Sequence, residues 1–296
     1  MTPEADRLVE QAARGESLLA AAAARFVANR SAVFGLVLLG LITSFALFGP
    51  FLSPHDMETN DWERIQIAPT FEQAHWFGTD ANGRDLFVRV AAGARVSLAI
   101  GLVTTLVAVV IGILYGAIAG YAGGRTDQVM MRVVDVLYAL PLFFAIIILV
   151  TVFGRNIFLV FLAIGAVEWL TIARIVRGQT LSAKQTEYVE AARSLGASPA
   201  RIVLRHIVPN VIGPVIVFST LLVPTVILVE SFLSFLGLGV QEPSTSWGLL
   251  ISQGVGALDT APWLLVAPAA FLAATMFAFN FIGDGLRDAL DPKDDT

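Results

Sequence analysis

The sequence predicts an all-α integral membrane protein with six membrane-spanning helices. Of its 296 residues, 56% are hydrophobic and only 15% are charged, whereas soluble domains are about 45–50% apolar and about 25% charged. Six apolar runs come near the roughly 20 residues that a helix needs to cross a hydrocarbon layer of about 30 Å. These runs are residues 32–52, 96–120, 133–153, 157–176, 211–233 and 263–282.

Residues 1–31 precede the first run and do not have the pattern of a secretory signal. They mix acidic with basic residues and contain no apolar core with a cleavage site close behind it. We predict a cytoplasmic amphipathic segment here, then a first transmembrane helix at 32–52 and an extracytoplasmic loop at 53–95. Residues 96–284 follow as a core of five transmembrane helices, and 285–296 as a cytoplasmic tail.

Four prolines, Pro141, Pro214, Pro224 and Pro268, fall inside the predicted spans. Helices in lipid tolerate proline where neighbouring helices satisfy the freed backbone groups. We therefore expect helices that pack closely against one another and bend at these positions.

Basic residues predict the orientation. With the N-terminus inside, all but five of the 19 Lys and Arg residues lie on the inner side; the five are Arg64, Arg84, Arg89, Arg95 and Arg155. Cytoplasmic loops carry an excess of Lys and Arg. Both termini are therefore expected in the cytoplasm, and so is the loop 177–208 between the fourth and fifth spans.

This inner loop has the pattern of two short helices joined by a turn. Tyr188, Ala191, Ala192 and Leu195 recur at the spacing of one helical face. Gly196 follows them and suits the left-handed position at which many helices stop.

The second half of the hairpin has its own start signal. Ser198 suits an N-cap and Pro199 the first helical position. Pro209 lacks the backbone donor that an unbroken helix requires. The pattern predicts a helix, a tight turn, a second helix, an interruption and then entry into the fifth span.

Composition alone leaves three interpretations of this hairpin open: a solvated connection, a DNA-binding helix-turn-helix, and a docking element for a cytoplasmic partner. Residues 191–206 have the rhythm of a helix-turn-helix, but they lack a third helix and a core of their own. They are also joined to the membrane at both ends, so no nucleic-acid partner is expected. Ala191 and Ala192 are small enough to let a partner surface approach closely.

The hairpin resembles the EAA loop of permeases of ABC importers. The resemblance rests on Glu-Ala-Ala at 190–192, Gly196 four positions later, and Pro209 at the end of a short apolar run. His206 and Val208 depart from the Ile and Leu that are usual in this loop.

Three further stretches, residues 77–98, 230–248 and 279–294, are similar to motifs of the peptide/nickel branch of these importers and occur in the same order. Together with the first span, they make the chain similar to the C-type permease subunits of oligopeptide importers.

The resemblance implies a subunit of a heteromeric importer in the bacterial cytoplasmic (inner) membrane. Its implied partners are the lipid bilayer, a homologous second permease, two cytoplasmic P-loop ATPases and an extracytoplasmic peptide-binding protein. Oligopeptides are the implied substrate, with dipeptides or nickel complexes as the alternative. The hairpin would couple the ATPases to the membrane, through Glu187, Tyr188, Glu190, Ala191, Ala192, Arg193, Leu195, Gly196 and Arg201.

No catalytic residue and no cofactor site are predicted in this chain. It has no phosphate-binding loop with its lysine, so ATP and Mg²⁺ would be bound by the partner ATPases. It has no cysteine, and its histidines His55, His75 and His206 are far apart in sequence. No metal site is therefore predicted.

Polar side chains within the spans are the candidates for the translocation path. A charge at mid-bilayer costs roughly 2.5–3.5 kcal/mol on insertion scales, and such groups usually face the bundle interior or a wet cavity. Glu168 lies deep in the fourth span without a basic neighbour one turn away. Glu230, near the outer end of the fifth span, and Asn280, in the sixth, are further candidates. A polar contact within the subunit is the alternative for Glu168.

An intramembrane acid-based enzyme is the remote alternative for the whole chain. Asp135, Glu168 and Asp284 could supply two acids, but Asp135 and Asp284 lie near the inner ends of their spans whereas Glu168 is deeper.

The outer loops are expected to face the binding protein, with Asp80, Arg84, Asp85, Glu242 and Trp247 as the candidate residues. The acidic spacing at 78–85 is reminiscent of a calcium loop, but the later acidic ligand is replaced by Ala91. A tight turn rich in Asp, Asn and Gly explains this spacing better.

Overall fold

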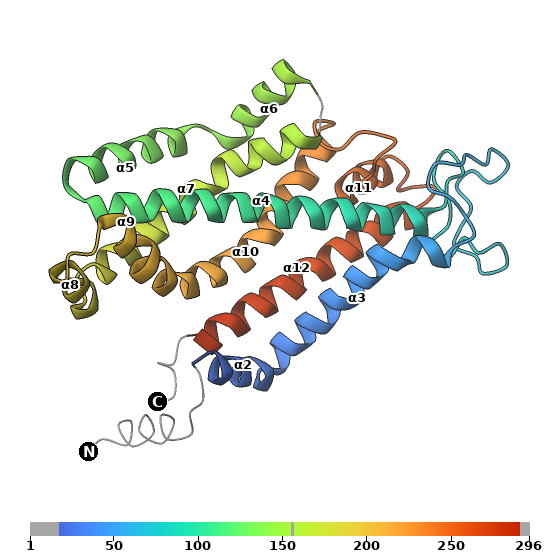
Figure 1. The fold of residues 1–296 in the computed structure, drawn as a ribbon. Coiled ribbons are helices and arrows are strands. Elements are labelled where there is room, and N and C mark those ends of the chain that lie inside the picture. Colours follow the sequence, from blue (N-terminus) through green and yellow to red (C-terminus); the bar gives the residue numbers. More distant parts are fainter. Residues whose placement is uncertain (1–17, 155–156, 291–296) are drawn as a thin grey trace.

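The computed structural model describes residues 18–154 and 157–290, and the regular structure in them is helical (Figure 1). Two isolated bridges in the loop that follows the first long helix are the exception. The predictions made for residues 1–17, and for 291–296 of the tail, lie outside the described residues.

The helices follow one another along the chain in the following order. They are α2 (Leu18–Ala28), α3 (Arg30–Leu52), α4 (Leu86–Ala122), α5 (Gly124–Ala139), α6 (Leu142–Phe153), α7 (Ile157–Ala183), α8 (Glu187–Ser194), α9 (Pro199–Ile202), the π-helical turn η1 (Val203–Ile207), α10 (Val208–Phe235), α11 (Trp247–Val255) and α12 (Trp263–Leu290).

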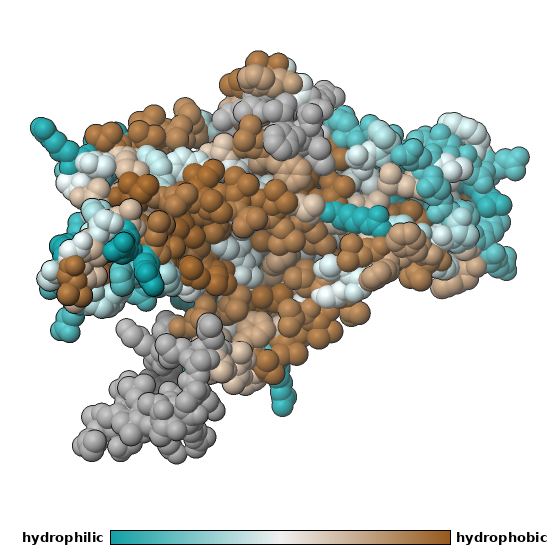
Figure 2. Space-filling view, in the orientation of Figure 1, coloured by the Kyte–Doolittle hydropathy of each residue, from teal (hydrophilic) through white to brown (hydrophobic). Residues whose placement is uncertain are grey.

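Four helical stretches in the described residues are long and apolar enough to cross a membrane. They are α3, α4, the continuous stretch Pro199–Phe235 and α12. Figure 2 shows hydrophobic side chains across the middle of the molecule and hydrophilic ones gathered at its two ends. The all-helical membrane class is confirmed, while the count of six spans stays a prediction.

The single helix predicted over 133–153 is divided in two. α5 ends at Ala139, Leu140 adopts an extended conformation with ψ of 131°, and α6 starts after Pro141. The residue before a proline is driven out of the helical region by contact with the proline ring. Pro141 therefore separates two helices instead of bending one.

The molecule has two different ends (Figure 1). We call the end formed by residues 53–85 and 236–262 the loop end, and the opposite end, which carries α8 and α9, the hairpin end. α2 lies at this opposite end as well, where the Arg25 guanidinium donates two hydrogen bonds to the carbonyl of Ala289 in α12. The first and last described segments are therefore fastened together.

α4 and α7 are the most closely packed pair of long helices. Gly112, Gly116 and Gly120 recur every fourth residue along the face of α4 that meets α7. A methyl group placed on Gly116 would overlap the carbonyl oxygen of Ala173, and one on Gly120 would lie 2.8 Å from Thr180 Cβ. Small residues at this spacing let two backbones approach closely in lipid.

Candidate functional site

The candidate site is the hairpin of α8 and α9. After α8, Gly196 turns the chain with a φ of +79°, a left-handed conformation that favours glycine. The hydroxyl of Ser198 accepts a hydrogen bond from the backbone N–H of Arg201, and Pro199 is the first residue of α9. The stop and start signals predicted from the sequence are therefore confirmed.

The hairpin exposes most of its predicted coupling residues. Eight of the nine are exposed, and only Ala192 is buried. Leu195 projects at the turn with 89% of its surface exposed. Beside it lies a hollow of about 360 Å³, lined by Tyr188, Ala191, Ala192, Leu195, Ala197, Arg201 and His206. An apolar projection next to a shallow hollow gives this surface a shape that another protein can match.

The inner face of the hairpin belongs to the core of the bundle. Val189, Ile202 and Ile207 are buried in one cluster with side chains of α4, α7 and α10. The amide of Asn210 in α10 donates a 2.6 Å hydrogen bond to the Tyr188 hydroxyl in α8. A force applied to the hairpin is therefore passed directly to the long helices.

The chain runs from α9 into α10 without a break. In the π-helical turn between them, the N–H of Val208 reaches back five residues to the carbonyl of Val203. Pro209 has no N–H, and its ring would meet the carbonyl four residues earlier in a regular α-helix. The wider turn just before it relieves this contact. The regular α-helix is thus interrupted before Pro209, as predicted, but by a π-helical turn and not by a break in the helical path. We call the continuous helical stretch Pro199–Phe235, of 37 residues, the rod.

Glu168 lies in α7, half-buried, beside the break between α5 and α6. It lines a hollow of about 380 Å³ with Tyr138, Ala139, Leu140, Pro141, Val167 and Thr171. Toward the hairpin end, Asp135 and Arg174 form an ion pair with a distance of 2.9 Å. The Arg174 guanidinium also lies 4.3 Å from the centre of the Tyr138 ring. The hollow thus combines an acid with an aromatic ring and a break in the helix.

The two other candidates for the translocation path have opposite environments. Glu230 is fully buried, and its carboxylate accepts a 2.6 Å hydrogen bond from Ser234. Because it is enclosed within the subunit, the carboxylate reaches no surface in this structure, and its assignment to the path loses its support. Asn280 on α12 is exposed.

Four charged residues form an ion network at the loop end. Arg84 donates 2.8 Å hydrogen bonds to both Asp80 and Glu242. Buried Arg89 pairs with the same two acids, and Gln253 donates a 2.9 Å hydrogen bond to Glu242. The hydrogen bond from Arg84 lowers the pKa of Glu242 to about 2. The network joins the first outer loop to the second.

Four of the five loop residues expected to face a partner are buried: Asp80, Arg84, Asp85 and Trp247. Their side chains make hydrogen bonds within the loop end. The indole N–H of Trp247, for example, donates a hydrogen bond to the carbonyl of Val90. Glu242 is the one with a substantially exposed side chain, at 42%. These residues hold the loops in shape, and the surface itself is formed by their neighbours.

Arg89 belongs to this network although it was not among the predicted site residues. We predicted residues 86–95 to be loop, whereas α4 starts at Leu86 with Asp85 as its N-cap. Asp85 directly before an apolar run was the available signal, because aspartate is a preferred N-cap residue. The helix places Arg89 one turn beyond this cap, inside the network.

Two known families account for most of the chain. Residues 108–294 match the family described as binding-protein-dependent transport system inner membrane component. Residues 17–69 match the N-terminal transmembrane domain of oligopeptide transport permease C.

Individual relatives cover nearly the whole length. The oligopeptide transport system permease protein OppC of Haemophilus influenzae is 54% identical over 290 residues, which make up 98% of this chain and 93% of the relative. OppC of Escherichia coli K12 is 56% identical over 280 residues, or 95% and 93% of the two chains. The dipeptide transport system permease protein DppC of Bacillus subtilis is 44% identical over 270 residues, or 91% and 84%.

Proposed function

Because this chain belongs to the binding-protein-dependent transport system inner membrane components, we propose that it forms half of the path by which an ABC importer moves oligopeptides inward. The chain is a multi-pass permease subunit of the inner membrane, and ATP hydrolysis belongs to separate subunits. The oligopeptide substrate is supported by identities of 54% and 56% to OppC proteins over more than nine-tenths of the chain.

The proposed topology has six spans, with α7 and the α5–α6 pair added to the four long apolar stretches. The hairpin end and both termini face the cytoplasm, in keeping with the excess of Lys and Arg on that side. The loop end then faces the extracytoplasmic binding protein. A homologous second permease completes the path, and two P-loop ATPases bind below.

The hairpin is the proposed coupling element. The observation that carries this proposal is that α8 and α9 are exposed on one face and packed into the bundle core on the other. An ATPase that holds Leu195 and the hollow beside it would move α10 together with the hairpin. Alternating access is largely rocking of rigid bodies around a central path. Movement of the hairpin would tilt the helices that it packs against.

Glu168 and Asn280 are the side chains that we propose to face the path or the second permease. Both lie on surfaces that the subunit itself leaves accessible, and Glu168 lines a hollow next to a helix break. Glu168→Leu is expected to lower peptide uptake while the chain still assembles. Full uptake by this variant would remove Glu168 from the path.

Co-purification tests the coupling proposal. The chain is tagged at its C-terminus, extracted gently from native membranes and analysed for the proteins that accompany it. We expect a second multi-span permease and P-loop ATPases with the wild type, and loss of the ATPases with Leu195→Asp. Leu258→Asp is the matched control, because Leu258 is also an exposed leucine but lies at the loop end.

Two results of this experiment would contradict the proposal. Extraction of the wild-type chain alone under every mild condition would contradict the importer assembly. Full retention of the ATPases by Leu195→Asp would contradict the role of the hairpin surface and leave the importer assembly standing.

Dipeptides are the second candidate substrate, because DppC of Bacillus subtilis is 44% identical to this chain. Competition between labelled oligopeptides and unlabelled dipeptides for uptake in cells separates the two. Strong competition by dipeptides would favour the second candidate.

A further inference from the structure

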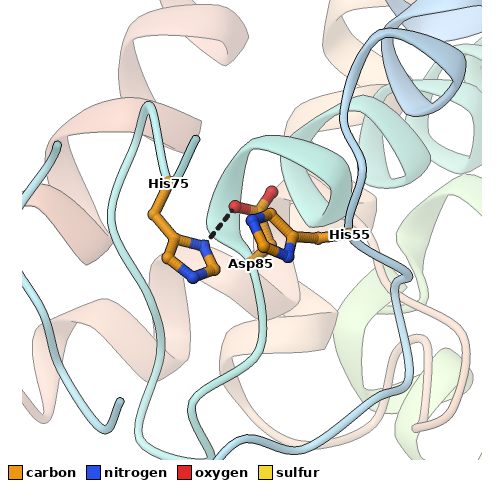
Figure 3. A group of neighbouring side chains, drawn as sticks. All are labelled: His55, His75 and Asp85. Atoms are coloured by element: carbon orange, nitrogen blue, oxygen red, sulfur yellow. Dashed lines mark hydrogen bonds and ion pairs between the residues drawn. The ribbon is translucent and has the colours of Figure 1, made fainter. Parts of the chain in front are cut away.

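Two of the three histidines of the chain meet at the loop end, next to the start of α4 (Figure 3). His55 follows α3, His75 lies in the loop 53–85, and Asp85 is the N-cap of α4. Each offers one ligand atom, and the three atoms lie within 4.8 Å of one another. Neither the hairpin nor the ion network uses these side chains.

We propose that His55, His75 and Asp85 form a binding site for a divalent transition-metal cation such as Zn²⁺. Imidazole nitrogens together with a carboxylate oxygen suit Zn²⁺ and its first-row neighbours, whereas Mg²⁺ and Ca²⁺ prefer oxygen ligands alone. Three protein ligands leave a fourth position for water. The site would fasten the chain just after α3 to the start of α4.

Two of the ligands are already held in place. His75 Nδ1 and Asp85 Oδ2 lie 2.8 Å apart, and both side chains are almost completely buried. The other oxygen of Asp85 accepts a 2.8 Å hydrogen bond from the backbone N–H of Val88. The carbonyl of His75 accepts hydrogen bonds from the N–H groups of Thr70 and Gly78, each 2.9 Å long. Ligands fixed in this way lose little freedom when a cation binds.

The cation takes the place of the proton between His75 Nδ1 and Asp85 Oδ2. The imidazole keeps one proton, which moves to Nε2, so binding requires no net loss of a proton from this ring. In the described structure His75 Nε2 is buried and has no hydrogen-bond partner. An unpaired nitrogen is therefore present with or without the cation, and binding adds no new unpaired group there.

His55 is the ligand that closes the site. Its ring is stacked on that of His75, with the centres 4.0 Å apart and 14° between the planes. Nearly parallel rings cannot both direct an in-plane lone pair at one cation, so His55 must turn out of the stack. It is only partly buried, which leaves the ring room to turn, and turning gives up the 2.9 Å hydrogen bond between its Nε2 and the carbonyl of Gln73.

Metal titration of the purified full chain in detergent tests the site. The chain carries a tag without histidine, is stripped with a chelator, and is titrated with Zn²⁺ by calorimetry and with Co²⁺ by visible absorption. We expect one Zn²⁺ per chain and a Co²⁺ spectrum of nitrogen and oxygen ligands. His55→Gln should weaken Zn²⁺ binding by at least about tenfold, and Asp85→Asn should weaken it while an N-cap is kept.

His206→Gln is the matched control, since His206 is the remaining histidine and lies at the hairpin end. It should bind Zn²⁺ like the wild type. Equal binding by His55→Gln and His206→Gln, or no stoichiometric binding by the wild type, would overturn the proposal. If His75→Gln fails to fold, His55→Gln and Asp85→Asn still decide the question.

Discussion

At the scale of single residues, Gly196 is required by its backbone conformation and not by lack of space for a side chain. A methyl group at this position would find no heavy atom within 4 Å, so space does not require glycine. The φ of +79° does, because a left-handed residue with a side chain costs about 1–2 kcal/mol unless it is Asn or Asp. Conformation alone explains why glycine stands in the turn of the hairpin.

Gly196→Ala should therefore loosen the hairpin, whereas Gly196→Asn should loosen it less despite its larger side chain. A loss of about 1–2 kcal/mol corresponds to opening that is about 5–30 times more frequent. Amide hydrogen exchange in α8 measures this opening. Faster exchange with Asn than with Ala would mean that crowding, and not backbone conformation, dictates the glycine.

Glu242 gives the loop end a defined dependence on pH. Its pKa falls from 4.5 to about 2 because of the hydrogen bond from Arg84. A group whose pKa is lowered by folding stabilises the folded state fully above its unfolded pKa, and this contribution is lost as the pH falls through the folded value. The ion network should therefore be intact above pH 4.5 and weaken between 4.5 and about 2.

The difference in thermal stability between the wild type and Glu242→Gln measures this contribution. We expect the difference to be largest at neutral pH and to shrink below pH 4.5. Glu72→Gln, a change of an exposed acid in the first outer loop and outside the network, controls for the loss of one charge at the loop end. A difference that does not change with pH would show that Glu242 acts through its shape and not through its charge.

At the scale of helices, the contact of α4 with α7 depends on the absence of side chains. Gly116→Ala places a methyl group against the backbone carbonyl of Ala173, which cannot move aside as a side chain could. Overpacking of this kind typically costs about 1–3 kcal/mol. Thermal unfolding in detergent should therefore show a clear loss of stability.

Gly213→Ala is the control for this contact. Gly213 also lies in a long helix, α10, but a methyl group there meets nothing within 4 Å. Alanine is favoured over glycine inside helices by about 0.5–1 kcal/mol, so this variant should be as stable as the wild type or more so. Equal losses from both variants would contradict the packing explanation.

The elements that were predictable from sequence are those set by local chemistry. The hairpin was predictable because Gly196, Ser198 and Pro199 each act on their own few residues. The π-helical turn before Pro209 was not, since one proline can be accommodated by a break or by a wider turn; in this structure the wider turn is adopted and Ile207 lies in the core cluster. The pairing of His55 with His75 depends on the path of a 20-residue loop segment, which no local pattern encodes.

At the scale of the whole molecule, the rod Pro199–Phe235 connects the two ends. A straight α-helix of 37 residues would be about 55 Å long at about 1.5 Å per residue. The rod begins in the hairpin and ends next to the loops that hold the ion network. In the proposed topology, motion of an ATPase bound at the hairpin end would therefore reach the loop end through one continuous helical stretch.

Spin-label distances test whether this rod moves as a unit. The chain has no cysteine, so single cysteines can be introduced without removing any. Ala200 in α9 and Phe218 in α10 are exposed positions on the same rod, and Phe34 is an exposed position on α3. In the assembled importer, ATP binding should leave the 200–218 distance unchanged.

The distance between labels at Ala200 and Phe34 should change under the same conditions, because α3 does not belong to the rod. This pair serves as the positive control for movement in the bundle. If the 200–218 distance changes or broadens instead, the π-helical turn is a hinge. The hairpin would then move independently of α10, and coupling would have to pass through its contacts with α4 and α7.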